Sequence, residues 1–303
     1  MFSKLFSKIK TKKYNLSDCY TTDIHSHLIP SIDDGVKTLD ESISIIKEMH
    51  SLGYKKIITT PHIMSHRFPN TKESIKEGYE KVKKELIKED IDIILEMAAE
   101  YYYDEHFIDL IRAKDLLTFG NNYVLFELSY TTKPFGLEQV IHELLSLGYK
   151  PVLAHPERYS YYSSDLDKYK RLKDLGLFFQ INLNSLNSFY GKKPKKAAEY
   201  LVDNHLVDFV GSDIHSMRYF DSLKNFTQSS KLKEVFDKNQ IKNDFIWFFI
   251  LNIFICLYNT CHFRNRIHKK HHNHIHIFHQ FQHHLKSYLH DYVSVLLLVY
   301  QGF

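Results

Sequence analysis

The stretch 21–35 reads TTDIHSHLIPSIDDG and places two histidines at the end of a strand-like run. Successive side chains of a strand point to opposite faces, so His25 and His27 project to the same side. Asp34 follows within the same stretch. Two imidazoles at one strand end are more typical of a polar strand end than of a metal site. The interpretation therefore depends on which other side chains reach the same place.

Six more strand-like runs follow this one, and segments of helical period separate several of them. The runs begin at Lys55, Ile91, Tyr123, Lys150, Leu177 and Val207. The predicted helices cover 38–53, 70–90, 136–148 and 194–205. Thr38 or Asp40 is expected to cap the first helix, and Gly53 is expected to end it. Repeated strand–helix units predict an α/β fold with a parallel sheet, which is either doubly wound or closed into a barrel.

Side chains that bind metal ions stand at the ends of six of these seven strands. Beside His25, His27 and Asp34, the set contains His62, Glu100, Glu127, His155, Asp213 and His215. The carboxyl ends of parallel strands meet at one edge, where the following loops build active sites. Any one of these residues alone is more often a cap, a turn residue or a solvated side chain. Their joint occurrence predicts that they converge on one metal site.

The composition of this set narrows the chemistry. Five histidines and four carboxylates are too many for one ion, and they suit two or three ions with a carboxylate between them. Because no cysteine joins them, the predicted metal is Mn²⁺, Fe or Zn²⁺, and the residues alone do not rank these. Three divalent ions against four carboxylates leave an excess charge of about +2, which a phosphate group of about −2 complements.

The whole chain has the composition of a globular protein. Of its 303 residues, 44% are hydrophobic and 25% are charged, which excludes a disordered chain. A formal net charge of +4 is too small to indicate nucleic-acid binding. Cys19, Cys256 and Cys261 show no paired spacing, which predicts a reducing compartment, and the chain does not begin with a secretory signal. We therefore expect a cytoplasmic protein.

Both ends of the chain differ from its middle, so three segments are predicted. Residues 1–19 form a basic segment that we expect to be solvated, with peripheral contact to an anionic membrane surface as the alternative. The metal-ligand motifs fall within a domain at 20–240. Residues 241–303 hold an apolar run too short for a typical membrane span, followed by ten histidines between His262 and His290. We interpret this tail as out-of-frame or read-through sequence, with a weakly ordered natural extension and a membrane anchor as alternatives.

The motifs of the middle segment resemble the PHP (polymerase and histidinol phosphatase) superfamily, and within it the bacterial manganese-dependent tyrosine-protein phosphatases of the CpsB/CapC/YwqE type. The resemblance rests on IHSHLIPSIDDG, TPHIM, AAEYY, LFELSY, VLAHPERY and GSDIHS, which follow one another between residues of about 20 and 220. It implies a distorted TIM-like (β/α)7 barrel, the PHP fold, and a centre of three metal ions held by the nine residues above. It also implies that Arg158 and Arg218 hold the phosphate.

The resemblance further implies a phosphoric monoester hydrolase that removes phosphate from tyrosine. The expected partner is the tail of a bacterial tyrosine kinase that controls capsule and exopolysaccharide synthesis. A phenolate leaves easily because tyrosine has a pKa of about 10, far below that of an aliphatic alcohol. Five aromatic residues near the predicted site are expected to stack on a phenyl ring: Tyr101, Tyr102, Tyr130, Phe135 and Tyr159.

Two other functions stay open at this point. One is a small-molecule phosphatase of the same superfamily that acts on a histidinol-phosphate-like monoester, and the other is a non-catalytic metal-binding module. A phosphocysteine mechanism is excluded, because no arginine follows Cys19 closely. His66 and Arg67 lie in a loop beside the predicted metal face, and we interpret them as a solvated pair. The oligomeric state is left open.

Overall fold

The computed structural model describes residues 16–245, apart from 163–164, 166 and 228. The expectations for residues 1–15 and for the tail from residue 246 onward lie outside the described residues. Cys256 and Cys261 also lie outside them, whereas Cys19 is a free thiol. Within the described part, no helix is both long enough and apolar enough to cross a membrane.

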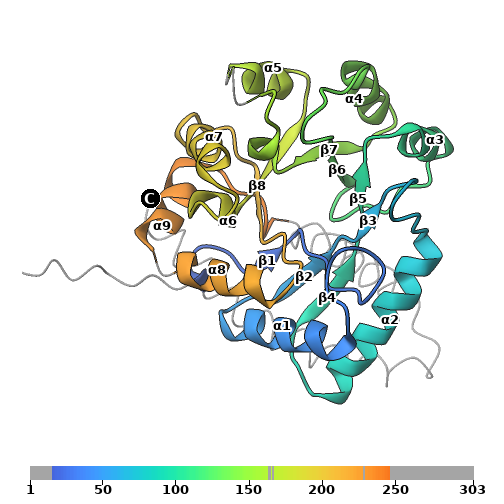
Figure 1. Ribbon diagram of the computed structural model, residues 1–303, viewed down its shortest axis with the longest axis vertical. Coiled ribbons are helices and arrows are strands. Elements are labelled where there is room, and N and C mark those ends of the chain that lie inside the picture. Colours follow the sequence, from blue (N-terminus) through green and yellow to red (C-terminus); the bar gives the residue numbers. More distant parts are fainter. Residues whose placement is uncertain (1–15, 163–164, 166, 228, 246–303) are drawn as a thin grey trace, which may run out of the picture. The chain divides into compact units, whose positions relative to one another are not determined.

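The strands of the described part form two parallel sheets, and helices surround them (Figure 1). The smaller sheet has the order β1 (Thr22–Asp23), β2 (Lys56–Thr59) and β4 (Ile94–Met97). The larger sheet has the order β3 (His62–Ile63), β5 (Glu100–Tyr102), β6 (Tyr123–Glu127), β7 (Lys150–Ala154), β8 (Phe178–Asn182) and β9 (Phe209–Gly211). All these pairs are parallel, which confirms the predicted α/β class.

Two sheets arise because two of the predicted strands are each interrupted. One predicted run becomes β2 and β3, and the next becomes β4 and β5. Pro61 stands directly before β3 and has no N–H to donate to a ladder. Across the break, the amide of Ala98 donates to Thr59 O at 2.9 Å and that of Glu100 donates to Pro61 O at 3.1 Å. The two runs therefore stay side by side although their ladder is broken.

The last strand-like run returns to the first. A parallel bridge joins Ser26 to Ile214, and it is flanked by two backbone hydrogen bonds. The amide of His27 donates to Ile214 O at 2.9 Å, and that of Asp213 donates to His25 O at 2.8 Å. With this bridge, the seven runs are linked in sequence order, as the distorted (β/α)7 arrangement requires.

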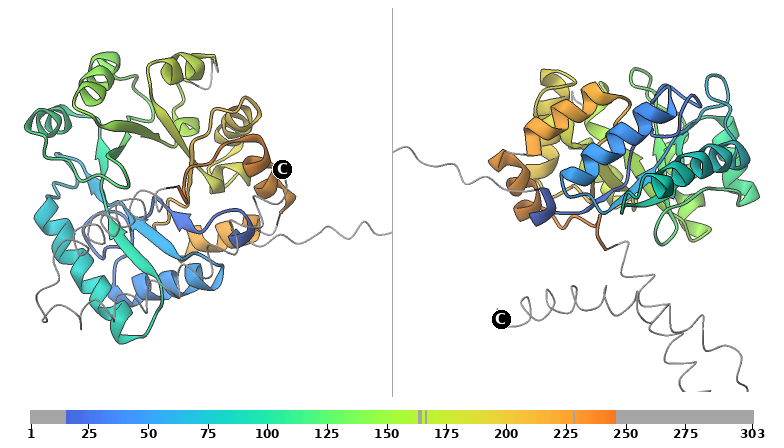
Figure 2. Two further views of the ribbon diagram at one scale, coloured as in Figure 1. Left: turned by 180° about the vertical axis from the view of Figure 1, so that it is seen from behind. Right: turned by 90° about the horizontal axis from the view of Figure 1, so that it is seen from below.

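Helices connect the strands and cover their outer side (Figure 1). They are α1 (Leu39–Ser51), α2 (Lys72–Lys88), α3 (Glu105–Ala113), α4 (Leu137–Ser146), α5 (Lys168–Asp174), α6 (Leu183–Leu186), α7 (Lys192–Asp203), α8 (Met217–Thr227) and α9 (Ser230–Lys238), with 3₁₀ turns at Leu16–Asp18 and Pro156–Arg158. Figure 2 shows α1 and α2 lying side by side on the outside of the strands. The four predicted helices correspond to α1, α2, α4 and α7. Periodicity missed helices such as α3 and α9, which have nine residues each.

The helix ends follow their capping residues. The Thr38 side chain caps α1 by accepting from the amide of Glu41, as one of the two predicted caps. Gly53 follows the end of α1 with φ of +106°, a conformation that glycine adopts without strain. At α2, Thr71 and Ser74 form a capping box.

Residues just beyond position 240 pack against the strands. Asn243 is fully buried, and its Nδ2 donates to Thr22 O and Val210 O, both at 2.8 Å. Asp244 accepts from the amide of Thr21 at 3.0 Å. These contacts tie the first and last strands together, so the body that holds the metal-ligand motifs includes residues 241–245.

Candidate metal centre

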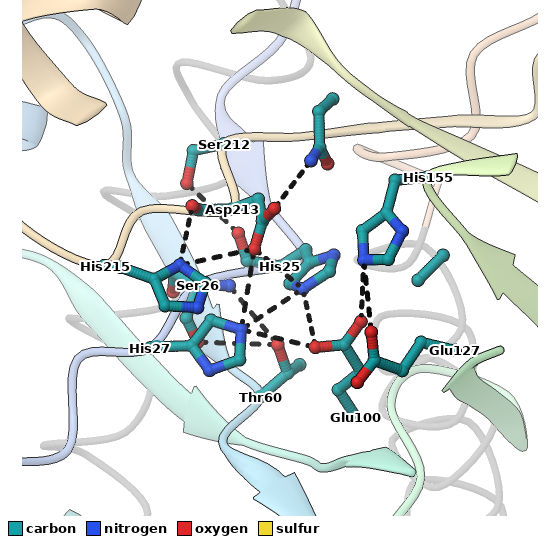
Figure 3. A network of polar contacts seen from close by, with 12 residues as sticks. His25, Ser26, His27, Thr60, Glu100, Glu127, His155, Ser212, Asp213 and His215 are labelled. Atoms are coloured by element: carbon teal, nitrogen blue, oxygen red, sulfur yellow. Dashed lines mark hydrogen bonds and ion pairs between the residues drawn. The ribbon is translucent and has the colours of Figure 1, made fainter. Parts of the chain in front are cut away.

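All nine predicted ligands lie together at the carboxyl ends of the strands. Figure 3 shows them without Asp34 and His62. They form four overlapping groups, and within each group the ligand atoms lie within 4.8 Å of one another. The groups are His27, Asp34, His62 and His215; His25, Glu100 and His155; His25, His27 and Asp213; and His62, Glu100 and Glu127. Because the groups share members, the candidate ion positions are neighbours that share ligands.

Glu100 stands at the centre of the cluster and is fully buried. Its Oε2 lies 3.2 Å from His25 Nε2 and 3.3 Å from His27 Nε2. The same oxygen lies 3.2 Å from His62 Nδ1, and Oε1 lies 3.0 Å from His155 Nε2. One carboxylate therefore faces four imidazoles, which is an arrangement suited to a bridging ligand between two ions.

Two aspartates complete the cluster. Asp213 Oδ1 lies 3.3 Å from His25 Nε2 and 3.5 Å from His215 Nδ1. Asp34 Oδ1 lies 3.4 Å from Nε2 of both His62 and His215. The Asp34 side chain is 38% exposed, whereas that of Asp213 is 2% exposed. The cluster is therefore accessible to solvent on the Asp34 side.

The orientation of two imidazoles indicates that cations belong in the cluster. Nδ1 of His25 contacts Gln180 Oε1 at 2.7 Å, and Nδ1 of His27 contacts Asp33 Oδ2 at 2.8 Å. Both oxygens only accept hydrogen bonds, so each neutral ring carries its proton on Nδ1. The two Nε2 lone pairs then face each other at 3.3 Å, with Glu100 Oε2 beside them. Electron pairs that converge in this way need positive charge between them, which protons supply in the metal-free protein and divalent metal ions would supply when bound.

Unpartnered polar atoms point to the same conclusion. Among the described residues, Asp34 Oδ1, His62 Nδ1 and Glu100 Oε2 are buried without a partner in hydrogen-bond geometry, although each lies 3.2–3.4 Å from another ligand atom of the cluster. A buried polar atom left unsatisfied costs about 1–3 kcal/mol, and native proteins keep few of them. The donor set of the cluster therefore fits a metal centre.

Burial and crowding shift the pKa values within the cluster. Burial raises the pKa of Glu127 to about 8, and the nearby Glu100 carboxylate adds to the shift. Burial alone would lower the pKa of His25, but the carboxylates of Glu100 and Asp213 outweigh it and raise this pKa to about 9. Glu100 has the same effect on His62, whose pKa rises to about 10 against the effect of burial. At neutral pH, the metal-free cluster therefore holds protons that bound cations would displace.

Two of the nine residues have strained backbones. His155 has φ of +34° and Asp213 has φ of +49°, both in the left-handed region. This conformation costs a residue with a Cβ atom about 1–2 kcal/mol. Such strain is found mainly where a side chain must be presented in one direction, as at functional sites.

Seven of the nine candidate ligands line a cavity of about 690 Å³, and the other two, His25 and His27, are fully buried. Phe68, Tyr102, Tyr130 and Tyr219 contribute aromatic rings to its walls. Tyr102 and Tyr130 are two of the five aromatic residues that we expected there. A phenyl ring is therefore able to enter between aromatic side chains on its way to the cluster.

The other three expected aromatic residues are not among those that line this cavity. Tyr101 and Tyr159 are fully buried, and their hydroxyls contact the backbone at Leu117 N (2.6 Å) and Ala154 O (2.9 Å). Phe135 is 96% exposed. Strand alternation explains the position of Tyr101. Its neighbour Tyr102 faces the cavity, so the side chain of Tyr101 points to the opposite side of β5.

Of the two predicted arginines, Arg158 lines the cavity. Its Nη1 donates to Asp213 Oδ2 at 3.0 Å. The guanidinium lies between the rings of Tyr130 and Tyr190, at 4.6 and 4.3 Å from their centroids. Arg218 is exposed, lies over another aromatic ring at 5.3 Å and is not among the lining residues. The planar fork of Arg158 is therefore the better placed of the two for gripping phosphate oxygens.

The loop that carries His66 and Arg67 contributes to the cavity wall. Arg67 Nη2 lies 3.5 Å from Asp34 Oδ2, and its guanidinium lies over the Phe68 ring at 4.8 Å. Phe68 in turn stacks on the imidazole of His62. The Arg67 side chain is 61% exposed, so it is solvated as expected, but it also places a positive charge at the mouth of the candidate site.

Sequence reasoning missed the residues that support the ligands. In the Asp33–Asp34 pair only Asp34 belongs to the predicted ligands, and nothing in the sequence marked Asp33 as the partner of His27. Gln180 and Asn182 lie on β8, the strand whose end carries no predicted ligand. Their spacing of two residues at a strand end matches that of His25 and His27, and this was the available signal.

A comparison with protein families gives one match that covers most of this region. The family described as "Capsular polysaccharide synthesis, CpsB/CapC" matches residues 21–233. The chain belongs to the CpsB/CapC family. That span contains all nine candidate ligands and both predicted arginines.

Similar proteins place this member of the CpsB/CapC family among phosphatases. Tyrosine-protein phosphatase CpsB of Streptococcus pneumoniae is 31% identical over 235 residues, which cover 73% of this chain and 96% of that protein. Tyrosine-protein phosphatase YwqE of Bacillus subtilis is 32% identical over 197 residues, which cover 65% of this chain and 78% of that protein. A solved structure from work on these two proteins, described as unique metal-dependent tyrosine phosphatases, superposes with a TM-score of 0.60 at 28% identity. It covers 73% of this chain and 96% of the solved chain.

Proposed function

We propose that this chain is a metal-dependent protein-tyrosine phosphatase. The observation that carries the proposal is one cavity whose lining combines seven of the nine clustered ligands, the Arg158 guanidinium and aromatic walls. The other two ligands, His25 and His27, are fully buried in the same cluster. Membership of the CpsB/CapC family supports it, because similar proteins are named tyrosine-protein phosphatases.

We propose that the nine residues hold two or three Mn²⁺ ions. Imidazole and carboxylate ligands without thiolate suit Mn²⁺, and they also suit Fe or Zn²⁺. When bound, such ions supply Lewis acidity and lower the pKa of water towards neutrality. Asp33 and Gln180 prepare the site by holding the protons of His27 and His25 on Nδ1, so that each Nε2 faces the ions.

Arg158 is proposed to bind the phosphate. Its Nη1 donates to Asp213, and a guanidinium carries five N–H donors, so further donors serve phosphate oxygens. The rings of Tyr130 and Tyr190 hold the guanidinium plane in place, which lets it stabilise charge that builds up on the phosphoryl group. Arg67 lies near Asp34 and adds positive potential at the entrance for a dianionic substrate.

Phosphotyrosine fits this site better than phosphoserine or phosphothreonine. The longer aromatic stem reaches past the walls formed by Phe68, Tyr102 and Tyr130, and those rings offer surfaces for its phenyl group. The phenolate also leaves with little proton donation, because its conjugate acid has a pKa of about 10. We propose that the physiological substrate is the tyrosine-rich tail of a bacterial tyrosine kinase that controls capsule or exopolysaccharide synthesis in the cytoplasm.

Substitution of two ligands tests this function. His155→Ala and Asp213→Ala are each expected to abolish hydrolysis of a phosphotyrosine peptide with Mn²⁺, because each leaves the cluster incomplete. Circular dichroism and metal content, measured on the same samples, separate loss of the ion from loss of the fold. An alanine variant that stays active without bound metal would refute the mechanism. Equal kcat/KM values for matched phosphotyrosine and phosphoserine peptides would leave a general phosphatase and reject the tyrosine preference.

A further inference from the structure

Two amide side chains lie beside the cluster on the strand that supplies no predicted ligand. Gln180 and Asn182 are fully buried at the carboxyl end of β8. They are two residues apart and therefore face the same side of the strand. β8 pairs with β7 and β9, and the runs of those two strands lead directly into His155 and Asp213.

The two amides link two candidate ligands through consecutive hydrogen bonds. His25 Nδ1 contacts Gln180 Oε1 at 2.7 Å. Gln180 Nε2 donates to Asn182 Oδ1 at 2.9 Å, and Asn182 Nδ2 donates to Asp213 Oδ2 at 2.6 Å. The hydrogen bonds thus run without a gap from the His25 imidazole to the Asp213 carboxylate, and the other atoms of these two groups, His25 Nε2 and Asp213 Oδ1, face each other in the cluster.

Chemistry fixes the direction of every bond in this chain. An ionised Asp213 carboxylate only accepts, so Asn182 must present its NH₂ group to it and its oxygen to Gln180. Gln180 must then present its NH₂ group to Asn182 and its oxygen to His25. An imidazole that faces an oxygen must carry its proton on that nitrogen, which is Nδ1. The charge of Asp213 therefore determines, through two amides, that the His25 Nε2 lone pair faces the metal cluster.

The same row of hydrogen bonds helps to orient the Asp213 carboxylate. Its Oδ2 accepts from Asn182, from Arg158 Nη1 at 3.0 Å and from the Tyr190 hydroxyl at 3.3 Å. Three donors on one oxygen hold the carboxylate so that Oδ1 points towards His25 Nε2, at 3.3 Å. His25 and Asp213 thus each have one atom, Nδ1 or Oδ2, bound by the two amides. Their other atoms, Nε2 and Oδ1, face the cluster.

A glycine makes room for this arrangement. A Cβ atom on Gly211 would lie 2.6 Å from Gln180 Nε2 and 2.8 Å from His25 Cβ. Gly211 has no positive φ to explain its presence, so space is the reason for glycine here. β9 therefore accommodates the contact between Gln180 and His25.

We propose that Gln180 and Asn182 are positioning residues that form an amide relay, which keeps His25 in the Nδ1-protonated tautomer and Asp213 with Oδ1 towards the ions. This inference rests on the proposed metal centre. Partners of metal ligands in this role typically change metal affinity by about 10- to 100-fold when they are replaced.

Threonine and valine at position 182 provide a matched test, because they have the same shape and differ in the hydroxyl. A threonine hydroxyl can accept one hydrogen bond and donate another, as the Asn182 amide does, whereas valine can do neither. In the full chain, we expect Asn182→Val to weaken Mn²⁺ binding by about 10- to 100-fold. Asn182→Thr should bind Mn²⁺ more tightly than Asn182→Val. Equal Mn²⁺ affinities of the two variants would overturn the relay.

A double-mutant cycle supplies a second test. Gln180→Met removes both links of residue 180 while it keeps an unbranched side chain. If the relay works as one unit, the double variant Gln180→Met/Asn182→Val binds Mn²⁺ little more weakly than the weaker single variant. Losses that multiply would show two independent supports and reject the relay. If Asn182→Val does not fold, the comparison of Gln180→Met with Gln180→Met/Asn182→Thr carries the same test.

Asn239 provides the control. It is a buried asparagine that donates to Val202 O and Val235 O. In the part of the chain that the structure describes, it makes no hydrogen bond to a residue of the cluster. Asn239→Val is expected to lower the melting temperature of the apo chain and to leave Mn²⁺ affinity unchanged. The histidines of the tail are the same in every variant, so their contribution cancels in the comparison. A wild-type chain that binds no Mn²⁺ would reject the metal centre itself, whereas a binding wild type with unaffected variants would reject only the relay.

Discussion

At the scale of single residues, the two arginines named from the sequence now have different expected roles. Arg158 lines the cavity and contacts Asp213, so Arg158→Ala should lower kcat/KM for a phosphotyrosine peptide by about 10²- to 10³-fold. Arg158→Lys should recover little, because an ammonium group has neither the planar fork nor the stacking between two rings. Steady-state kinetics with saturating Mn²⁺ measures both variants.

Arg218 serves as the matched comparison. Its guanidinium lies over Phe189 and it is not among the residues that line the cavity, so Arg218→Ala should change kcat/KM by no more than about threefold. A large loss for Arg218→Ala together with a small loss for Arg158→Ala would contradict the assignment.

The convergence of the ligands was predictable because their chemistry is visible in the residue types. Histidine and acidic residues at the ends of parallel strands must meet at one edge, and the structure brings all nine together. The residue type did not identify the supporting residues Gln180, Asn182 and Asp33. Amides and single acidic residues occur at many strand ends and turns. Of the five expected aromatic residues, Tyr102 and Tyr130 line the cavity, whereas Tyr101, Phe135 and Tyr159 do not. Alternation along β5 accounts for Tyr101 alone.

At the scale of elements, the start of α3 supports the cavity wall. Asp104 Oδ1 accepts from the amide of Phe107 as the cap of α3, and Oδ2 accepts from Ser65 N at 3.2 Å and Ser65 Oγ at 2.8 Å. The cap thus fastens the loop that carries Arg67 and Phe68. Asp104→Ala should lower the free energy of unfolding by about 1–2 kcal/mol. It should also raise KM for a phosphotyrosine peptide and change kcat little, because the cluster itself is untouched.

Thr71 caps the neighbouring helix α2 and provides the control for this effect. Thr71→Ala should cost a similar free energy of about 1 kcal/mol and leave KM unchanged. Urea unfolding combined with steady-state kinetics separates the two results. If both variants raise KM equally, general loosening of the fold explains the change, and the connection through Ser65 does not.

Long helices and the order of the elements followed from the sequence, whereas the breaks in the strands did not. Helices α1 and α2 are visible in the sequence through the spacing of their apolar residues and their capping residues. Their starts lie within a few residues of the prediction. The interruptions at Thr60–Pro61 and Ala98–Ala99 depend on how neighbouring runs pair, which a single run does not reveal. Proline in the first run was the local signal for its break.

At the scale of the whole molecule, the structure gives a specific end point for a shortened chain. Ending the chain at residue 240 removes Asn243 and Asp244, which bind the first and last strands. Each buried backbone group that loses its partner costs about 1–3 kcal/mol. We expect a chain ending at 245 to keep its metal and its activity, and one ending at 240 to melt at a clearly lower temperature. Calorimetric scans of the two chains with Mn²⁺ decide this, and equal melting temperatures would contradict it.

Metal binding should depend on pH in a definite direction. The pKa values of His25 (about 9), His62 (about 10) and Glu127 (about 8) are raised in the metal-free protein, so these groups hold protons at pH 7. Bound cations must displace those protons, so the apparent Mn²⁺ affinity should rise from pH 6 towards pH 9. Calorimetric titration in two buffers of different ionisation enthalpy should show net proton release at pH 7. Binding without proton release and without pH dependence would contradict the charge state inferred for the cluster.

The central claim is that nine residues from across the chain hold one group of metal ions. The most direct test is anomalous X-ray scattering at the manganese edge from crystals grown with Mn²⁺. The account predicts two or three neighbouring peaks among these residues, each about 2.0–2.6 Å from its ligand atoms, with Glu100 between peaks. Anomalous peaks found elsewhere, with none among the nine residues, would contradict the account.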